Sequence, residues 1–254
     1  MTLCALRLEA DSMTHQGHVR AENEDSLIVR QQDAVWAVAD GMGGHRNGQY
    51  ASNKVISEIE KADIPEDFET ACAAVADAIH NANSQLYQEV ASSNEQMGST
   101  VVALVIRDQK FAILWAGDSR AYLLRDHVFY QLSRDHTQVQ DMIDRGLLTP
   151  DQAIGHPMGH VLSRAVGVQS DLQIDAITDQ IIAGDIFLLC SDGLHGVVGE
   201  TQLVSIVERG GRHSAEQLVE ASLANGAPDN VSVVLVSALE TTTLSFVDNG
   251  DGSQ

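Results

Sequence analysis

Hydrophobic positions along the first ninety residues follow two different periods. Residues 3–13 and 26–40 carry short apolar runs, and the run AVWAVAD indicates a buried strand that ends on Asp40. From residue 48 to residue 62 the apolar positions take helical spacing, and residues 67–90 continue that spacing along a second stretch. The pattern therefore predicts strands followed by a pair of helices.

The period returns to two after the second helix. The runs STVVALVI, KFAILWAGD, SRAYLLRD and HVFYQLS are rich in β-formers, and turn-like residues separate them, which is typical of an antiparallel meander. Residues 135–167 are polar and irregular, with short helices expected around residues 139–145 and after a capping Thr149. A segment this long without regular structure is expected to have a function.

The last third of the chain repeats the alternation of strands and helices. Strands are predicted in LQIDAIT and DIFLLCSD, helices at residues 200–208 and 214–224, and a closing strand in NVSVVLVSAL. Strands grouped with strands and helices grouped in pairs predict an α+β fold, with sheets packed together and helices outside. No internal repeat or linker divides the chain, so we expect one domain over residues 1–240 and a disordered polar tail at 241–254.

Composition narrows the set of partners. There are 36 Asp and Glu residues against 15 Lys and Arg, a net charge of −21, which repels phosphate backbones and anionic lipids and argues against nucleic-acid and membrane partners. An anionic substrate remains compatible with this charge where bound cations reverse the field. With no signal-peptide pattern and no run near the roughly 18 apolar residues of a membrane span, we expect a cytoplasmic protein. Cys4, Cys72 and Cys190 lack paired spacing and are expected to be reduced.

Four aspartates share one local pattern, an apolar β-type run followed by an acid beside glycine or inside a tight turn. They are Asp40 in VADG, Asp118 in WAGDSR, Asp192 in LLCSDG and Asp229 in GAPDNVS. Each one alone is more simply explained as a turn. Four acids at the edge of a core, however, need a shared positive charge. Oxygen ligands with few histidines and no cysteines favour Mg²⁺ or Mn²⁺ over zinc.

Two further features lie close to these aspartates. Glu24 and Asp25 are adjacent acids in GHVRAENEDS, and because neighbouring strand residues face opposite sides, we expect only one to be a direct ligand. The glycines after Asp40 do not fit nucleotide loops, because the spacing places arginine at 46 and glutamine at 49 where glycine and lysine are needed. They are expected to let the backbone bend and to present the Gly41 carbonyl to an ion.

These stretches together resemble a known family, the metal-dependent Ser/Thr protein phosphatases of type 2C in their bacterial form. The similarity spans about residues 14–237, and its motifs occur in the family's order. They are GHVRAENEDS, VADGMGGH, MGSTVVALVI, WAGDSRAYLL, LSRDHTQVQDMIDRGLLTPDQA, GHPMGHVLSRAVG, LLCSDGLHGVV and APDNVSVVLV.

The resemblance implies a four-layer α-β-β-α fold, a central antiparallel β-sandwich flanked by helix pairs, with the metal centre at one end. It implies hydrolysis of phosphoserine and phosphothreonine in proteins by a metal-activated water at a binuclear Mg²⁺ or Mn²⁺ centre. It also implies a role opposite a bacterial Ser/Thr kinase in signalling or secretion control. We expect a monomer.

The resemblance also places the family's site residues on this chain. Asp40 would bridge two ions, Asp192 and Asp229 would hold the first, and Glu24 or Asp25 would serve the second, directly or through water. Gly41 would offer its carbonyl, and Asp118 with Asp192 would form a looser third metal site. Arg20 would bind the phosphate, so that Arg20, Asp40 and Asp192 are the expected catalytic residues.

Some positions depart from the pattern or leave alternatives open. Eukaryotic relatives place a histidine general acid where this chain has Met42, and His45 is a weak substitute. Ser163 and Arg164 fall in the flap, residues 135–167, and receive no catalytic role. Arg20 could instead form a surface salt bridge to a nearby glutamate, Glu22 or Glu24. A catalytically silent phosphoprotein-binding module and a structural protein with turn-forming aspartates are the competing functions.

Overall fold

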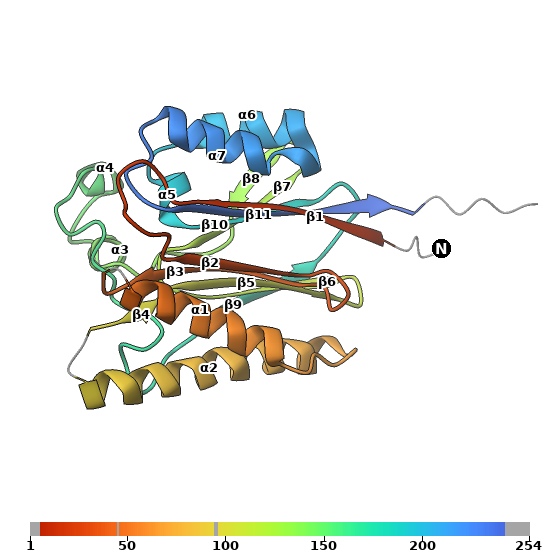
Figure 1. Ribbon diagram of the computed structural model, residues 1–254. Helices are drawn as coiled ribbons and strands as arrows, with labels where there is room; N and C mark the ends of the chain where they lie inside the picture. The colour runs from red at the N-terminus through yellow and green to blue at the C-terminus, as the bar shows by residue number, and fades with distance from the viewer. Residues whose placement is uncertain (1–5, 45, 94–95, 242–254) are drawn as a thin grey trace, which may run out of the picture.

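Two antiparallel sheets lie face to face at the centre of the molecule (Figure 1). The structure is a computed structural model, and it describes residues 6–44, 46–93 and 96–241. The first sheet has the order β1-β11-β10-β7-β8, and the second has the order β2-β3-β5-β6-β9, with β4 paired to β3. The strands are β1 (Leu6–His15), β2 (Asp25–Arg30), β3 (Val35–Met42), β4 (Gly98–Ser99), β5 (Val101–Arg107), β6 (Lys110–Ala116), β7 (Arg120–Arg125), β8 (Val128–Gln131), β9 (Asp175–Gln180), β10 (Ile186–Cys190) and β11 (Val231–Glu240).

Helices cover both outer faces of this sandwich. In Figure 1, α1 and α2 lie below the second sheet, and α6 and α7 lie above the first. The order of layers is therefore α-β-β-α, and the predicted fold class is confirmed. The helices are α1 (Arg46–Lys61), α2 (Phe68–Ser93), α3 (Gln138–Asp144), α4 (Pro150–Ala153), α5 (Asp192–His195), α6 (Glu200–Gly210) and α7 (Ala215–Ala224), with a 3-10 turn at Gly211–His213.

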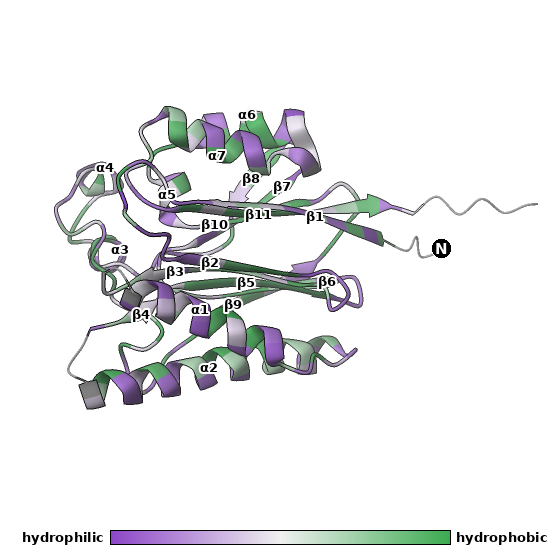
Figure 2. Ribbon diagram, viewed as in Figure 1, coloured by the Kyte–Doolittle hydropathy of each residue, from purple (hydrophilic) through white to green (hydrophobic). Residues whose placement is uncertain are grey.

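Three apolar layers hold the four structural layers together. Along β3, Val35 and Ala37 face the α1/α2 layer while Trp36 and Val38 face the other sheet, as period two requires. Between the sheets, Phe111 of β6 meets Phe187 of β10 edge to face with ring centroids 4.8 Å apart. Figure 2 shows the result, hydrophobic strands at the centre and helices that mix hydrophilic and hydrophobic residues.

One expected connection is wrong. The four β-rich runs do not form a single meander, because β6 belongs to the second sheet and β7 to the first. The chain crosses between the sheets at Gly117–Ser119, where Gly117 has φ +113°. A period of two predicts strands but does not say which sheet each one joins. The crossing matters for the site because it carries Asp118 to the end where the sheets meet.

Local signals in the polar segments are mostly confirmed. Thr149 caps α4 in a reciprocal capping box with Gln152, and the turn between β7 and β8 has positive φ at Asp126 and His127. The strand expected in LQIDAIT begins later, at Asp175. The predicted disordered tail lies outside the described residues from position 242 onward. None of the described helices is long and apolar enough to cross a membrane.

Candidate functional site

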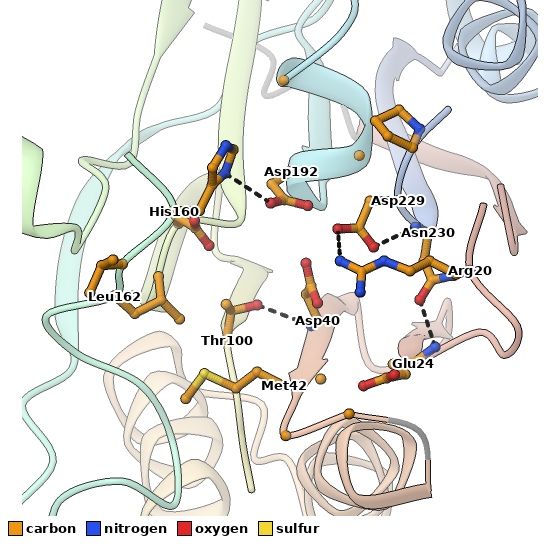
Figure 3. Close-up of a pocket in the computed structure, with 18 of the residues that line it drawn as sticks. Arg20, Glu24, Asp40, Met42, Thr100, His160, Leu162, Asp192, Asp229 and Asn230 are labelled. Atoms are coloured by element: carbon orange, nitrogen blue, oxygen red, sulfur yellow. Dashed lines mark hydrogen bonds and ion pairs between the residues drawn. The ribbon is translucent and has the colours of Figure 1, made fainter. Parts of the chain in front are cut away.

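A pocket of about 930 Å³ opens at one end of the sandwich (Figure 3). Its lining gathers residues that are far apart in sequence, from the β1–β2 loop, the end of β3, the β6–β7 crossing, α5 and the turn before β11. Seven of the eight predicted site residues line this pocket, and Asp25 is the exception. The seven are Arg20, Glu24, Asp40, Gly41, Asp118, Asp192 and Asp229.

The pairing of β2 with β3 places three of the acids together. Asp25 lies directly opposite Asp40 in the register, and the Gly41 N–H donates to the Glu24 carbonyl at 3.1 Å. Asp25 is buried, and its carboxylate accepts a 2.7 Å hydrogen bond from the Ser191 hydroxyl. Glu24 is therefore the member of the adjacent pair that lines the pocket, although it lies just before β2 and not on the strand itself.

Close packing explains two of the glycines near Asp40. A Cβ at Gly41 would lie 2.0 Å from the Gly48 carbonyl oxygen, and a Cβ at Gly48 would lie 1.7 Å from Glu24 Oε2. Gly43 and Gly44 have φ values of +129° and +79°, which side-chain-bearing residues rarely adopt. The cluster thus lets β3 turn sharply into α1 while Glu24 lies against the first turn of that helix.

The other ligand candidates come from the first sheet. Asp192 is not the end of a strand, as the sequence suggested, but the first residue of α5, two positions after β10. Asp229 lies two residues before β11. The carboxylates of Asp192 and Asp40 lie close enough for each to affect the pKa of the other, so the centre bridges the ends of both sheets.

Burial dominates the electrostatics of this cluster. Removal from water and, to a smaller extent, neighbouring carboxylates raise the pKa of Asp25 and of Asp118 to about 7. The pKa of Asp40 and that of Asp192 are also raised, again first by burial and then by the other aspartates. Among the pocket-lining side chains, the cationic guanidinium is that of Arg20. The acids therefore lack a matching positive charge within the described lining.

The donor set fits hard divalent cations. Asp25 Oδ1 and Asp192 Oδ1 are buried and make no hydrogen bond, which is costly for a carboxylate oxygen unless a cation meets it. In the described ranges no three His, Cys, Asp or Glu side chains gather closely enough to hold an ion alone. That agrees with Mg²⁺-type sites, which take one or two carboxylates per ion and keep several waters.

Arg20 lies at the side of the pocket opposite His160 (Figure 3). Its Nη2 donates to Asp229 Oδ2 at 2.5 Å, and the side chain is half exposed. Arg20 thus forms a salt bridge, but its partner is Asp229 and not Glu22 or Glu24 as the alternative prediction had it. The pairing with Asp229 fixes the guanidinium beside the carboxylate cluster, with its planar fork at the pocket wall.

Several lining residues were not singled out from the sequence. The Thr100 hydroxyl accepts a hydrogen bond from the Asp40 N–H at 3.0 Å and shares a 2.6 Å hydrogen bond with the Ser119 hydroxyl. The sequence feature that could have pointed to Thr100 is the polar pair Ser99–Thr100 next to an apolar run. His160, which lies within the flap range 135–167, has Nδ1 4.0 Å from Asp192 Oδ2. Met42 lines the pocket, whereas His45 lies outside the described residues.

Two residues of the flap, Ser163 and Arg164, lie outside the pocket lining. Arg164 Nη1 instead donates to Asp175 Oδ1 at 2.6 Å. The same nitrogen lies 3.1 Å from Nε2 of the buried His136. This network ties the flap to the first residue of β9.

Comparison with known proteins agrees with this geometry. A family model described as protein phosphatase 2C matches residues 3–141. The serine/threonine protein phosphatase PstP of Mycobacterium tuberculosis is 35% identical over 94% of this chain and 47% of its own length. The serine/threonine phosphatase stp of Listeria monocytogenes is 33% identical over 90% of this chain and 95% of its own. The chain thus spans about half of the mycobacterial relative and nearly all of the listerial one.

A solved structure extends the likeness to three dimensions. The catalytic domain of PstP in complex with two manganese ions superposes with a TM-score of 0.83 at 33% identity, covering 93% of this chain and all of that one. The ordered motifs, the four-layer fold and the carboxylate-lined pocket lead to one conclusion. This chain belongs to the protein phosphatase 2C family.

Proposed function

We propose that this chain is a metal-dependent protein phosphatase that hydrolyses phosphoserine and phosphothreonine in proteins. One observation carries the proposal, namely that a guanidinium and a cluster of partly buried, under-compensated carboxylates share one open pocket. The relatives that match nearly the full length of this chain carry the same activity in their names. A binding-only module would not need such an acid set.

The ligand roles follow the placement of the oxygens. Asp40 would serve both ions, because it lies near the end of β3 and its carboxylate interacts electrostatically with that of Asp192. Asp192 and Asp229 would hold one ion, and the Gly41 carbonyl with Glu24 the other. Asp25, buried behind this layer, would act through water, and Asp118 would hold a third ion together with Asp192. When bound, Mg²⁺ or Mn²⁺ ions would supply Lewis acidity, lowering the pKa of water and neutralising phosphate charge.

The remaining chemistry belongs to the chain's own residues. Arg20 would receive two phosphate oxygens on its planar fork and orient the phosphoryl group over the carboxylate cluster. Asp40 is held in place by hydrogen bonds at its own backbone, because its N–H donates to Thr100 and its carbonyl accepts the Thr100 N–H at 2.8 Å. Such fixed placement is what positional catalysis requires.

We also infer the finer setting of this activity. A phosphoprotein phosphatase of this kind would work against a Ser/Thr kinase in the same cytoplasm, in signalling or secretion control, and would act as a monomer. The kinase setting is supported by the family's habit, and the acidic composition argues against nucleic acid and lipid as partners. The monomer is inferred because the sequence has no coiled-coil or edge-pairing pattern.

The experiment that tests the proposal is hydrolysis of a phosphothreonine peptide in EDTA, Mg²⁺ or Mn²⁺, beside an Asp192→Asn variant. We expect release of phosphate that needs metal and is lost in the variant, with metal binding followed separately by calorimetry. Binding of metal without release under any condition would contradict the phosphatase and point to a binding module. Release that persists in EDTA would contradict the metal centre.

A further inference from the structure

The loop between β1 and β2 carries two proposed site residues but is not part of any β-sheet. Arg20 and Glu24 lie in residues 16–24, after His15 and before Asp25, where the structure has bends and irregular backbone. Hydrogen bonds from neighbouring elements reach this loop near its start and at Glu24. Further contacts are needed to keep a guanidinium and a carboxylate in fixed positions.

We infer that Asn230 is the positioning residue that holds this loop, and with it Arg20 and Glu24, in the site. Asn230 directly precedes β11, lines the pocket and is 4% exposed. Figure 3 shows its side chain between Asp229 and Glu24. It touches no reacting group in this arrangement, so its role is exerted through its neighbours.

The side chain of Asn230 meets the loop at three points. Its Oδ1 accepts the backbone N–H of Glu24 at 2.8 Å. Its Nδ2 donates to the carbonyl of Gln16 at 2.7 Å and to that of Glu22 at 3.0 Å. Both amide donors and the acceptor are therefore used on one loop, and the loop is held at its start and at its end.

The backbone of Asn230 also contacts residues in the rest of the site. Its N–H donates to Asp229 Oδ1 at 2.9 Å, while Asp229 Oδ2 meets Arg20 at 2.5 Å. Its carbonyl oxygen lies so close to Gly193 that a Cβ there would be 1.8 Å away. Gly193 follows Asp192 in α5, so Asn230 joins the loop to residues from both sides of the carboxylate cluster.

Only an amide of this length satisfies these contacts. A carboxylate at position 230 would place an acceptor against the carbonyls of Gln16 and Glu22 and would add negative charge to an acidic cluster. Alanine would leave the Glu24 N–H and both carbonyls without these partners in a partly buried place. The consequence for catalysis rests on the proposed phosphatase function, whereas the ordering of the loop does not.

Hydrogen exchange on the metal-free protein tests the ordering directly. In the wild-type protein the Glu24 amide should be protected although it lies outside the β2–β3 ladder. In Asn230→Ala and Asn230→Asp we expect exchange in residues 16–24 to speed up at least ten-fold, with β5 and β6 unchanged. The matched control is Asn225→Ala, which removes an exposed amide that donates to the Val197 carbonyl at 3.1 Å. An unprotected Glu24 amide, or equal exchange in control and variants, would overturn the inference.

Kinetics then separates positioning from simple loss of stability. We expect Asn230→Ala to raise KM for a phosphothreonine peptide about ten-fold, the equivalent of one charge-assisted hydrogen bond. In an Arg20→Ala background the same change should raise KM less than three-fold, because its effect passes through Arg20. Multiplicative effects in the two backgrounds would show a purely structural role and overturn the inference. A wild-type protein without activity would contradict the proposed function alone, since the exchange experiment needs no turnover.

Discussion

At the scale of single residues, Arg20 shows how one side chain can serve both folding and chemistry. Its Nη2 donates to Asp229 at 2.5 Å, and proximity to Asp229, Glu24 and Asp192 raises the pKa of the guanidinium further. A lysine could keep a single contact to Asp229 but could not present two parallel N–H groups to a phosphate. The identity of the cation should therefore matter for substrate more than for metal.

Arg20→Lys tests this distinction. We expect KM for a phosphothreonine peptide to rise about ten-fold, the cost of one charge-assisted hydrogen bond, while Mn²⁺ affinity changes less than about three-fold. Steady-state kinetics and calorimetry measure the two quantities. An unchanged KM would refute the phosphate role, and a large loss of Mn²⁺ affinity would show that Arg20 mainly organises Asp229.

Asp118 allows a test in which pH separates burial from metal binding. Burial raises the pKa of Asp118 from 3.8 to about 7. The folded metal-free protein thus binds this proton more tightly than the unfolded chain, and the contribution of Asp118 to stability falls as pH rises from about 4 to about 7. Above that window the ionised, buried carboxylate destabilises the fold in full.

Asp118→Asn should remove this penalty. Without metal, the variant should equal the wild type near pH 4 and exceed its free energy of unfolding by about 4 kcal/mol at pH 8. Urea unfolding of both proteins in EDTA at several pH values gives the difference. A variant less stable than the wild type at pH 8 would mean that the carboxylate is compensated inside the protein.

At the scale of elements, the first turn of α1 is shaped by the site rather than by helix propensity. Gly48 lies in that turn, and alanine there would ordinarily stabilise a helix by about 1 kcal/mol. The added Cβ, however, would lie 1.7 Å from Glu24 Oε2 and 2.9 Å from the Gly41 carbonyl oxygen. Helix formation and ligand placement therefore favour different residues at this position.

We expect Gly48→Ala to weaken Mn²⁺ binding at least ten-fold and to lower thermal stability rather than raise it. The matched control is Gly199→Ala at the start of α6, where nothing lies within 4 Å of the new Cβ. Calorimetric titration and thermal unfolding compare the two variants. Raised stability with unchanged metal affinity in Gly48→Ala would show that Glu24 simply moves aside.

The elements also show what the sequence could and could not predict. Periods of two and 3.6 placed the strands and helices within a few residues, because one face of each element is buried. The assignment of β6 and β7 to different sheets is invisible to such periods. The aspartates that line the pocket could be singled out because an acid that follows an apolar run at the edge of a core is costly. Asn230 was missed because its role depends on backbone atoms of residues 16, 22 and 24, which no spacing encodes.

At the scale of the whole molecule, the negative net charge and the proposed phosphate site have opposite effects on a phosphorylated substrate. A net charge of −21 repels phosphorylated substrates at long range, while the pocket offers them the Arg20 guanidinium. Cations bound at the carboxylates would reverse the field only nearby, because salt screens exposed charges beyond about 8 Å at physiological ionic strength. The residues flanking a phosphorylated side chain, which stay outside that range, should therefore meet a negative surface.

This predicts a preference for basic phosphopeptides that depends on salt. Of two phosphothreonine peptides that differ only in flanking arginines or glutamates, the basic one should have a kcat/KM about ten-fold higher at low ionic strength. The ratio should fall to about two-fold in 0.5 M salt, where the screening length is roughly 4 Å. A peptide with neutral flanks is the control and should fall between them. A ratio that stays constant with salt would place the selectivity in direct contacts, and a preference for glutamates would mean that bound cations dominate far beyond the pocket.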